Sequence, residues 1–343
     1  MRPFEPHPLL HSAHAMTIAA AFVRRRFPDL PPAQARLFEV EPAGEQRPRT
    51  VLRGDAHWQR DRLHRPVLVF VHGLEGSSDS GYMLGIAEKA SRAGFNVIRM
   101  NQRNCGGTEN LSPTLYNSGL SGDYAAVLRD LIDRDGFAEV FFGGYSMGGN
   151  LVMKMAGEFG DAAPSQLKAV GVVCPALDLA ACADAISEPR NFLYEWRFVR
   201  SLKARASRKA ALFPDAIPLD GLEKVRTVRD FDDRITAPHF GFQSASDYYF
   251  RASALRCVRN VSVPALVLAA KDDPIVPHAS LRVPDVLQNP QIVLELTEHG
   301  GHCGYLSRWP GVDRFWAEAR LVEFFLAHSN SLPAGNATTM SWE

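Results

Sequence analysis

The stretch EVFFGGYSMGGNLVMK, residues 139–154, decides the fold of this chain. Its apolar start predicts a strand, its last residues favour a helix, and the motif G-x-S-x-G at residues 144–148 joins the two. On such a turn the hydroxyl of Ser146 stands clear of the sheet, at the positive end of a helix dipole. The glycines fit because so sharp a bend leaves no room for Cβ atoms. We therefore predict that Ser146 is a nucleophile, with a Gly-rich turn that carries a surface serine as the alternative.

A nucleophilic serine needs an imidazole that takes its proton and a carboxylate that orients the imidazole. Residues 264–270 (PALVLAA) form an unbroken apolar run typical of a buried parallel strand, and KDDPIVP follows at 271–277. Open α/β sheets place functional groups where their strands end. We predict Asp273 as the acid because it directly precedes the Pro-Ile-Val-Pro turn. Asp272, one residue nearer the strand, is the alternative.

The candidate histidine follows the last predicted strand, residues 292–296, in the stretch EHGGH at 298–302. We predict His302 as the base because two glycines precede it and a small-residue loop follows it, so its ring can swing toward the serine. His299 is then an exposed loop histidine. The order along the chain is serine, acid, histidine, which is one of the orders known for such triads.

The oxyanion of an acyl-transfer transition state requires two backbone N–H donors. Met147, the residue after the nucleophile, supplies one of them. The run VLVFV at 67–71 predicts a strand, and small residues in the loop HGLEGSS at 72–78 let the chain curl after it. We predict the N–H of Leu74 as the second donor. For His72 we expect a hydrogen bond that holds the loop and no proton transfer.

Apolar strands alternate with helical stretches over most of the chain, which predicts a mostly parallel, doubly wound α/β sheet covered on both faces. The alternation stops after residue 173 and resumes at residue 263, an interval too long for one crossover helix. Its many aromatic and basic residues favour a helical cap over the site. The expected strands are 35–40, 50–53, 67–71, 95–100, 139–144, 168–173, 264–270 and 292–296, and the expected helices are 82–93, 121–133, 148–158 and 312–326.

These patterns divide the chain into one core in two parts, an insertion and a tail. Residues 1–174, with an N-terminal helix, and residues 263–328 form the core. Residues 175–262 form the cap insertion. The small, polar residues 329–343 predict a disordered tail.

Composition argues against several classes of function. The chain has 343 residues, 46% of them hydrophobic, and 38 basic side chains balance 38 acidic ones. A neutral chain has no electrostatic attraction to nucleic acid. Basic runs such as residues 24–26 are typical of solvated helix faces, so we expect at most peripheral membrane contact. The oligomeric state cannot be read from the sequence.

The five cysteines show neither paired spacing nor a C-x-x-C motif, which favours a reducing compartment and a cytoplasmic location. Cys105 and Cys303 fall in loops near the predicted site, where we interpret them as small residues that fill tight turns rather than as redox or nucleophilic groups. No cluster has metal-ligand spacing, so we expect neither a metal nor a cofactor.

The apolar stretch 15–23 is too short to span a bilayer, and its positive charge follows it instead of preceding it as in a signal peptide.

Longer stretches of the chain carry a family resemblance. They are HGLEGSSDSGY (72–82), NQRNCGGTEN (101–110), LYNSG (115–119), DFDDRITAPHFGFQSASDYY (230–249), AAKDDPIVP (269–277) and GGHCGY (300–305). Together they resemble the YheT-like branch of the α/β-hydrolases, the type 4 group, over nearly the whole chain. The resemblance implies the α/β-hydrolase fold with a helical cap, and the family's triad falls by position on Ser146, Asp273 and His302.

The resemblance also implies an activity, the hydrolysis of carboxylic esters with short or medium acyl chains, or of acylglycerols, through an acyl-enzyme. Asn104, where glycine is usual, and Asn117, where histidine is usual, depart from the pattern and bear on substrate preference rather than on chemistry. Three alternatives stay open: an acyltransferase with an alcohol as acceptor, a thioesterase, and a ligand-binding protein without activity. An intact triad argues against the last, because a binding protein has no use for it.

Overall fold

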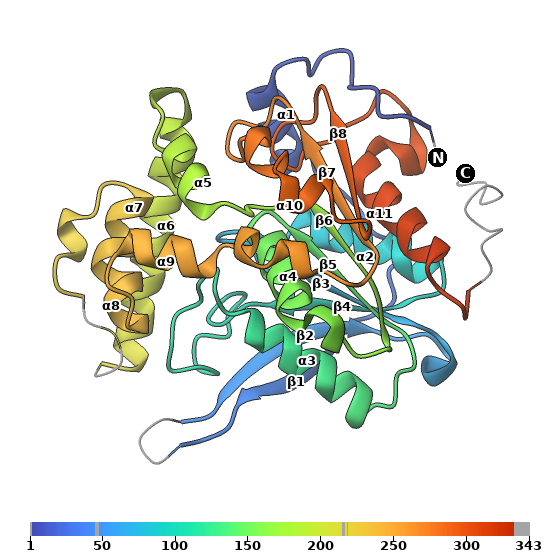
Figure 1. Cartoon of the computed structure of the whole chain (residues 1–343), viewed down its shortest axis with the longest axis horizontal. Helices are drawn as coiled ribbons and strands as arrows, with labels where there is room; N and C mark the ends of the chain where they lie inside the picture. Colours follow the sequence, from blue (N-terminus) through green and yellow to red (C-terminus); the bar gives the residue numbers. More distant parts are fainter. Residues whose placement is uncertain (1, 45–47, 215–216, 218, 333–343) are drawn as a thin grey trace.

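The computed structural model describes residues 2–44, 48–214, 217 and 219–332. Within them the strands are β1 (Gln34–Glu41), β2 (Thr50–His57), β3 (Val67–Val71), β4 (Asn96–Asn101), β5 (Val140–Tyr145), β6 (Leu167–Val173), β7 (Ala265–Ala270) and β8 (Ile292–Thr297). They form one sheet in the order β1-β2-β4-β3-β5-β6-β7-β8 (Figure 1). β2 pairs antiparallel with β1 and β4, and all other neighbours run parallel. The predicted mostly parallel sheet is confirmed.

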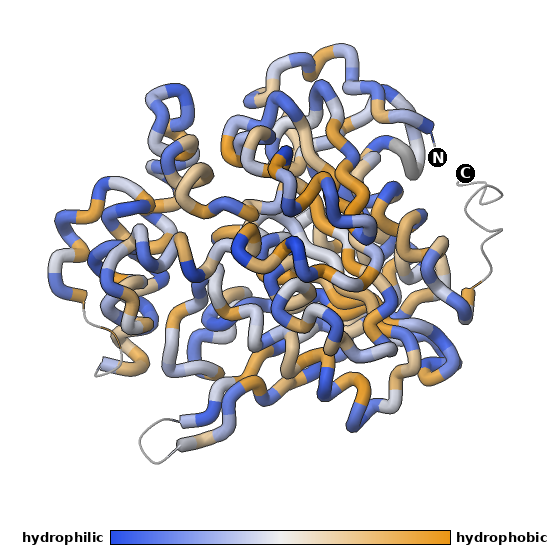
Figure 2. The backbone as a smooth tube through the Cα atoms, in the orientation of Figure 1, coloured by the Kyte–Doolittle hydropathy of each residue, from blue (hydrophilic) through white to orange (hydrophobic). Residues whose placement is uncertain are grey.

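Helices cover both faces of this sheet. Those of the core are α1 (Ala13–Phe22), α2 (Gly81–Arg92), α3 (Ser121–Asp133), α4 (Met147–Phe159), α10 (Pro284–Leu287) and α11 (Trp316–Ala327). Buried side chains of α2 and α11 form one apolar cluster with the residues that point to one face of the central strands. Buried side chains of α3 and α4 form a second cluster on the other face. Figure 2 shows the hydrophobic stretches gathered in these central elements.

Alternation within single strands explains the two layers. Along β3, Leu68 and Phe70 belong to the cluster with α2 and α11, whereas Val67, Val69 and Val71 belong to the cluster with α3 and α4. Successive side chains of a strand point to opposite faces, so an all-apolar strand supplies both cores at once. The central strands β3, β5 and β7 therefore hold their ends, where the candidate residues lie, on a fully buried base.

The interval between β6 and β7 contains helices and no strand among its described residues. Its α-helices are α5 (Leu179–Ile186), α6 (Phe192–Leu212), α7 (Val228–Phe231), α8 (Ala237–Phe240) and α9 (Ala245–Ala252), and a π-helix spans Asp232–Thr236. In Figure 1 they form a body beside the sheet. Helices thus occupy the interval for which the sequence predicted a cap, while the predicted domain boundaries stay a prediction.

Two elements differ from the sequence-based expectation. β2 runs to His57, four residues beyond the predicted end, because its second half pairs with β4 and tertiary pairing outweighs weak local preference. The last helix begins at Trp316 and not at residue 312. Phe315 forms an isolated β-bridge with Leu306, and a backbone paired in this way cannot be helical.

Two expectations on the ends and the surface can also be compared with the structure. Most of the tail predicted to be disordered, residues 333–343, lies outside the described residues. Of the helices that the structure describes, none has both the length and the apolar composition needed to cross a bilayer.

Candidate active site

Ser146 occupies the sharp turn between β5 and α4. Its backbone has φ of 52° and ψ of −118°, a conformation that is strained for a residue with a side chain. A Cβ atom on Gly144 would lie 2.4 Å from the carbonyl oxygen of Gly148, and one on Gly148 would lie 2.3 Å from that of Val71. Both distances are far inside van der Waals contact, so only glycine allows the turn to close. The motif that the sequence shows is therefore required by sterics.

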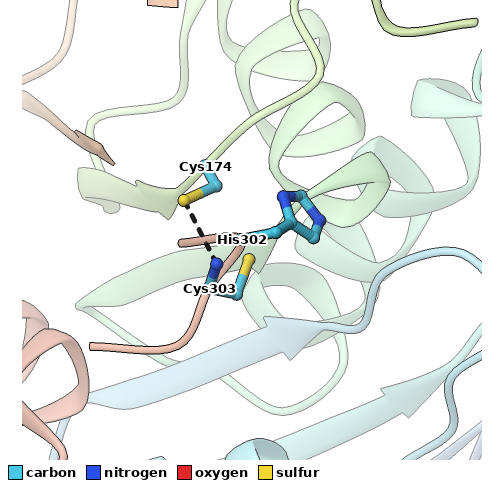
Figure 3. Close-up of side chains that lie close together, drawn as sticks. All are labelled: Cys174, His302 and Cys303. Carbon is cyan, nitrogen blue, oxygen red and sulfur yellow. Dashed lines mark hydrogen bonds between the residues drawn. The ribbon is translucent and has the colours of Figure 1, made fainter. Parts of the chain in front are cut away.

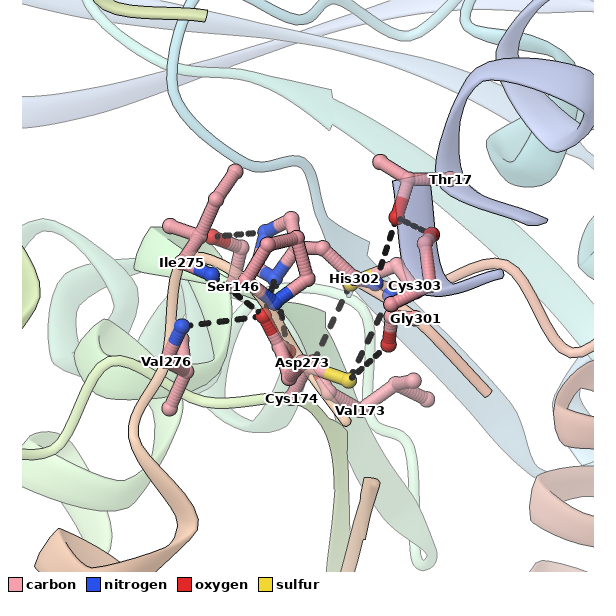
Figure 4. Close-up of polar contacts among 12 residues, drawn as sticks. Thr17, Ser146, Val173, Cys174, Asp273, Ile275, Val276, Gly301, His302 and Cys303 are labelled. Atoms are coloured by element: carbon pink, nitrogen blue, oxygen red, sulfur yellow. Dashed lines mark hydrogen bonds and ion pairs between the residues drawn. The ribbon is translucent and has the colours of Figure 1, made fainter. Parts of the chain in front are cut away.

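His302 and Asp273 lie beside Ser146, as Figure 4 shows. The Nε2 atom of His302 is 2.9 Å from the Ser146 Oγ, and its Nδ1 atom is 2.9 Å from the Asp273 Oδ2. The Asp273 Oδ1 also accepts the backbone N–H groups of Ile275 and Val276 at 2.8 and 2.9 Å. The turn after β7 thereby holds the carboxylate, the carboxylate holds the ring, and the ring faces the hydroxyl.

The two candidate acids have different surroundings. Asp272 accepts the backbone N–H of Gly301 at 2.9 Å and lies 3.4 Å from the Nδ1 atom of His299. The side chain of Asp272 is 22% exposed and that of His299 is 47% exposed, whereas that of Asp273 is only 2% exposed. The structure thus brings Asp273 together with His302, and it pairs the alternatives Asp272 and His299 with each other at the surface.

Electrostatics favour the protonated, positively charged form of the His302 ring. Burial opposes the imidazolium form, but the negative charge of Asp273 outweighs it and raises the pKa of His302 well above its ordinary value. A carboxylate that stabilises the imidazolium helps the ring to accept a proton from a hydroxyl. The arrangement can therefore remove the Ser146 proton when an electrophile approaches.

The loop after β3 passes directly over Ser146. A Cβ atom on Gly73 would lie 3.2 Å from the Ser146 Cβ, which shows how closely the two backbones approach. Leu74 follows in this loop, and Met147 is the first residue of α4, where N–H groups have no carbonyl partner within the helix. Both predicted oxyanion donors hence belong to segments that adjoin the hydroxyl.

Hydrogen bonds fix this loop on each side of Leu74. The Gly73 N–H donates to the Tyr82 hydroxyl at 3.0 Å, and the Glu75 N–H donates to the Tyr116 hydroxyl at 3.1 Å. The N–H of Leu74 lies between these two occupied groups and has no acceptor among the described residues. It is the available donor of this segment.

His72 has the structural role that its sequence position suggests. Its Nδ1 atom bonds to the carbonyl oxygen of Gly73 at 2.8 Å, and its Nε2 atom accepts the N–H of Gln102 at 3.2 Å. Complete burial lowers the pKa of His72 to about 4. The ring is neutral at physiological pH and ties the loop after β3 to the one after β4.

Comparison with known proteins assigns the family. Residues 66–308 match the family described as alpha/beta hydrolase fold. This chain belongs to the α/β-hydrolase family. The predicted fold class and family are thereby confirmed, and the match spans β3 to β8, the segment that carries every candidate residue named above.

Two curated relatives and one solved structure extend this finding. This hydrolase is 35% identical to the putative esterase YheT of Escherichia coli (strain K12), over 77% of its own chain and 78% of that protein. It is 29% identical to phospholipase ABHD3 of Mus musculus, over 79% of its own chain and 67% of that protein. Est1E from Butyrivibrio proteoclasticus shares the fold with a TM-score of 0.54 at 15% identity, over 86% of this chain and 98% of that one. The names of the two relatives agree with the predicted class of ester hydrolases.

A cavity of about 470 Å³ opens above Ser146 and His302. Core and insertion both line it, since residues from the loops after β3 and β5 face residues from α5, α6, α7 and α9. Asn117, one of the departures from the family pattern, is part of this lining, whereas Asn104 is not. Apolar lining residues from the insertion include Leu179, Ile186, Phe198, Leu202, Val228 and Phe231.

Sequence reasoning missed a buried ion pair that joins the loop after β3 to the insertion. The carboxylate of Glu75 accepts from the Arg205 Nε at 2.9 Å and from the Tyr116 hydroxyl at 2.5 Å, and it also bonds to the hydroxyl of Ser201. The side chains of Glu75 and Arg205 are only 7% and 9% exposed. Glu75 was visible within the family-like loop, but the sequence carried no signal that α6 would supply its partner.

The histidine loop has a further partner that the sequence did not indicate. The N–H of His302 donates to the hydroxyl of Thr17 in α1 at 2.8 Å. A Cβ atom on Gly301 would lie 2.6 Å from the carbonyl oxygen of Ala13, so α1 presses directly on this loop. The N-terminal helix is therefore part of the support of the site and does more than cover the core.

One group of side chains among the described residues has ligand atoms close enough to hold a metal ion. These are Cys174, His302 and Cys303, whose ligand atoms lie within 4.8 Å of one another. Both ring nitrogens of His302 already bond to Ser146 and Asp273. A metal ion on this ring would break one of those bonds, so we assign no metal to the group.

Proposed function

We propose that this protein is a carboxylic ester hydrolase that works through a triad of Ser146, His302 and Asp273. The observation that carries the proposal is the unbroken chain of hydrogen bonds from the Asp273 carboxylate through the His302 ring to the Ser146 hydroxyl, at the floor of a cavity. Such a chain activates a hydroxyl for attack on a carbonyl carbon. A binding protein on this fold would have no use for it.

The reaction proceeds in two steps. In the first, His302 takes the proton of Ser146 as its Oγ attacks the ester carbonyl, and the N–H groups of Leu74 and Met147 stabilise the oxyanion. The alcohol leaves with the proton from His302. In the second, water attacks the acyl-enzyme, again with His302 as the base, and the acid is released. Asp273 keeps the imidazole in the tautomer that both steps need.

The substrate is an ester or lipid with an apolar acyl part. Apolar side chains of the insertion line the cavity above the nucleophile, and they would surround an acyl chain rather than a charged group. The names of the two relatives, an esterase and a phospholipase, support the same class. We propose short or medium acyl chains or an acylglycerol-like ester.

A fluorophosphonate probe tests the proposal directly, because it labels only an activated serine. We expect the folded protein to be labelled at Ser146, with the position read from peptide masses, and we expect no label in His302→Ala or after denaturation. A panel of p-nitrophenyl esters of increasing acyl length then identifies the preferred chain. If circular dichroism shows that the protein is folded and it still takes no label, the result contradicts the proposed nucleophile.

The same panel separates hydrolysis from its alternatives. With water and ethanol in competition, a hydrolase releases mainly the free acid, whereas an acyltransferase yields mainly the ethyl ester. Acyl-CoA as a substrate tests the thioesterase alternative. Either a dominant ethyl ester or a strong preference for acyl-CoA would replace the proposed ester hydrolysis while keeping the triad.

We expect the substitution Glu75→Gln to lower kcat roughly 10- to 100-fold with little change in KM. It leaves the buried guanidinium of Arg205 without its charge partner, and breaking a buried pair costs about 3–5 kcal/mol. The loop that carries Leu74 then loses its tie to α6, and loss of one oxyanion donor costs about 10²–10³ in kcat. Steady-state kinetics and thermal unfolding measure the two effects.

The substitution Glu109→Gln is the matched control for this prediction. Glu109 pairs with Arg208 of the same helix α6 at 3.4 Å, and Arg208 is more than half exposed. Exposed pairs contribute only about 0–1 kcal/mol, so this variant should match the parent in kcat and stability. Equal kinetics for both variants would show that the Glu75 pair does not position the loop.

A further inference from the structure

Two cysteines, Cys174 and Cys303, lie close together beside the proposed base His302. Cys174 directly follows β6, whose last residue, Val173, accepts the backbone N–H of Ser146 at 2.9 Å. Cys303 directly follows His302. The two sulfur atoms lie within 4.8 Å of each other, and the Cys303 N–H donates to the Cys174 Sγ at 3.3 Å (Figure 3). The two cysteines come from loops far apart in the sequence, so their spacing along the chain does not indicate that they meet.

The two thiols differ in accessibility. Cys303 lines the cavity together with Ser146 and His302, and it is partly exposed. Cys174 is fully buried behind it and is not part of the lining. A small reagent that enters the cavity therefore meets Cys303 first and reaches Cys174 only through it.

The two thiols also differ in acidity. Burial opposes ionisation of Cys303, but its hydrogen bond with Cys174 and the positive charge of His302 outweigh burial and lower the pKa of Cys303 to about 6. For Cys174, burial and the neighbouring Cys303 raise the pKa well above its ordinary value. The thiolate is the reactive form of cysteine. The accessible thiol is thus also the nucleophilic one, and the buried thiol is placed to react second.

We propose that Cys303 and Cys174 form a redox modification site, which a hydroperoxide converts to a disulfide and which thereby separates His302 from Ser146. The loss of activity rests on the proposed ester hydrolysis, whereas the disulfide itself does not.

The chemistry is that of a reactive thiol with a resolving partner. The Cys303 thiolate attacks one peroxide oxygen, so an S–O bond forms and the O–O bond breaks. The other oxygen leaves as water or an alcohol after it takes up a proton. The Cys174 sulfur then attacks the sulfenic acid, an S–S bond forms, the S–O bond breaks, and a second water leaves with the Cys174 proton. Two thiols are oxidised and one peroxide is reduced.

Tight packing of the loop turns this small covalent change into a change at the active site. The sulfur atoms must approach to about 2.05 Å, the length of a disulfide bond. Gly301, Cys303 and Tyr305 have φ of 56°, 58° and 43°, and the first of these also presses on α1. A loop held in this way cannot absorb the shift elsewhere, so His302, next to Cys303, moves away from the serine.

The test uses the full chain, reduced and freed of reductant, and treated with hydrogen peroxide or with the apolar cumene hydroperoxide. Digestion without reductant and peptide masses show whether the Cys174 and Cys303 peptides become linked with loss of two hydrogen atoms. Ester hydrolysis is measured before oxidation, after it, and after dithiothreitol. We expect the linked peptide, a loss of activity of at least about 10-fold, and its recovery with dithiothreitol.

Variants assign the effect to the pair. Cys303→Ser should be resistant to peroxide, and Cys174→Ala should stop at a sulfenic acid on Cys303 that dimedone traps. Cys257→Ala is the matched control, because Cys257 is also partly exposed but lies away from the cavity, and it should behave like the parent. Peptide mapping of the parent chain needs no variant, so a variant that fails to fold does not remove the test.

Three results would overturn the proposal: no linked peptide in the oxidised parent chain, a linked peptide without loss of activity, or an equal loss in Cys303→Ser. Failure of the proposed function gives a different pattern. The reduced chain would then show no ester hydrolysis at all, while the peptide masses would still report whether the disulfide forms.

Discussion

The substitution Ser146→Ala should abolish ester hydrolysis while the protein keeps its fold. Removal of the nucleophile in a serine triad costs on the order of 10⁴–10⁶ in kcat, because His302 and Asp273 have no hydroxyl left to activate. Among the described residues, the side-chain oxygen of Ser146 bonds only to the His302 ring, and the backbone bonds of Ser146 to Val173 and Asn150 need no side chain. Stability should therefore change by no more than about 1 kcal/mol.

Steady-state hydrolysis of the best p-nitrophenyl ester, with thermal unfolding in parallel, measures both parts of this prediction. The fluorophosphonate label should disappear in the same variant, which excludes contamination by another hydrolase. A variant that keeps more than a few per cent of the parent rate would contradict the assignment of Ser146 as the nucleophile. A variant that loses activity together with its folded structure would show instead that the strained turn depends on the hydroxyl.

The second large effect separates the two neighbouring acids. We expect Asp273→Asn to lower kcat about 10⁴-fold, as the loss of the acid does in other triads. The new amide oxygen can keep the N–H groups of Ile275 and Val276, so its NH₂ group turns to the His302 Nδ1 atom. The Nδ1 atom must then accept a hydrogen bond from this NH₂ group, so the ring proton moves to Nε2. An imidazole protonated on Nε2 can no longer take a proton from the Ser146 hydroxyl.

Asp272→Asn is the control, with the same change of charge one residue away. Its carboxylate accepts the Gly301 N–H, which an amide oxygen can replace, and its other partner is the exposed His299. We expect a change of no more than a few fold in kcat. The opposite ranking of the two variants would exchange the roles of Asp272 and Asp273.

The pH profile gives an independent readout of the same pair. A general base must be neutral, so activity rises as the pH increases through the pKa of His302, which Asp273 holds above its ordinary value. In Asp273→Asn this support is lost and the pKa of His302 falls. The residual activity should therefore reach its plateau at a lower pH than in the parent. An unchanged acid limb would mean that another group sets it.

The nucleophile turn could be predicted from the sequence because its requirement is local. A backbone that bends at Ser146 with carbonyl groups within 2.5 Å of the Cβ positions of Gly144 and Gly148 tolerates no other residue, so the constraint is written as a motif. The strands β3, β5 and β7 were equally visible, since burial on both faces leaves unbroken apolar runs. Order along the chain then assigned the candidate acid and base.

What could not be predicted depends on contacts between distant segments. Glu75 meets Arg205 only because the insertion folds back over the loop after β3, and no periodicity records that. Cys174 and Cys303 are 129 residues apart and meet because β6 ends beside the histidine loop. From the sequence we interpreted Cys303 as a small residue in a tight turn. That interpretation does not include its contact with Cys174.

The bond between Thr17 and His302 has a consequence for how the protein is made. The two residues are separated by 285 positions, and at typical synthesis rates of about 5–20 residues per second the ribosome needs roughly 15–60 s to bridge them. Ser146 and its turn emerge long before the segment that carries His302. The nascent chain hence passes through a period in which the proposed nucleophile exists without the proposed base, and we expect hydrolytic competence only when the segment that carries His302 docks onto α1, which is made earlier.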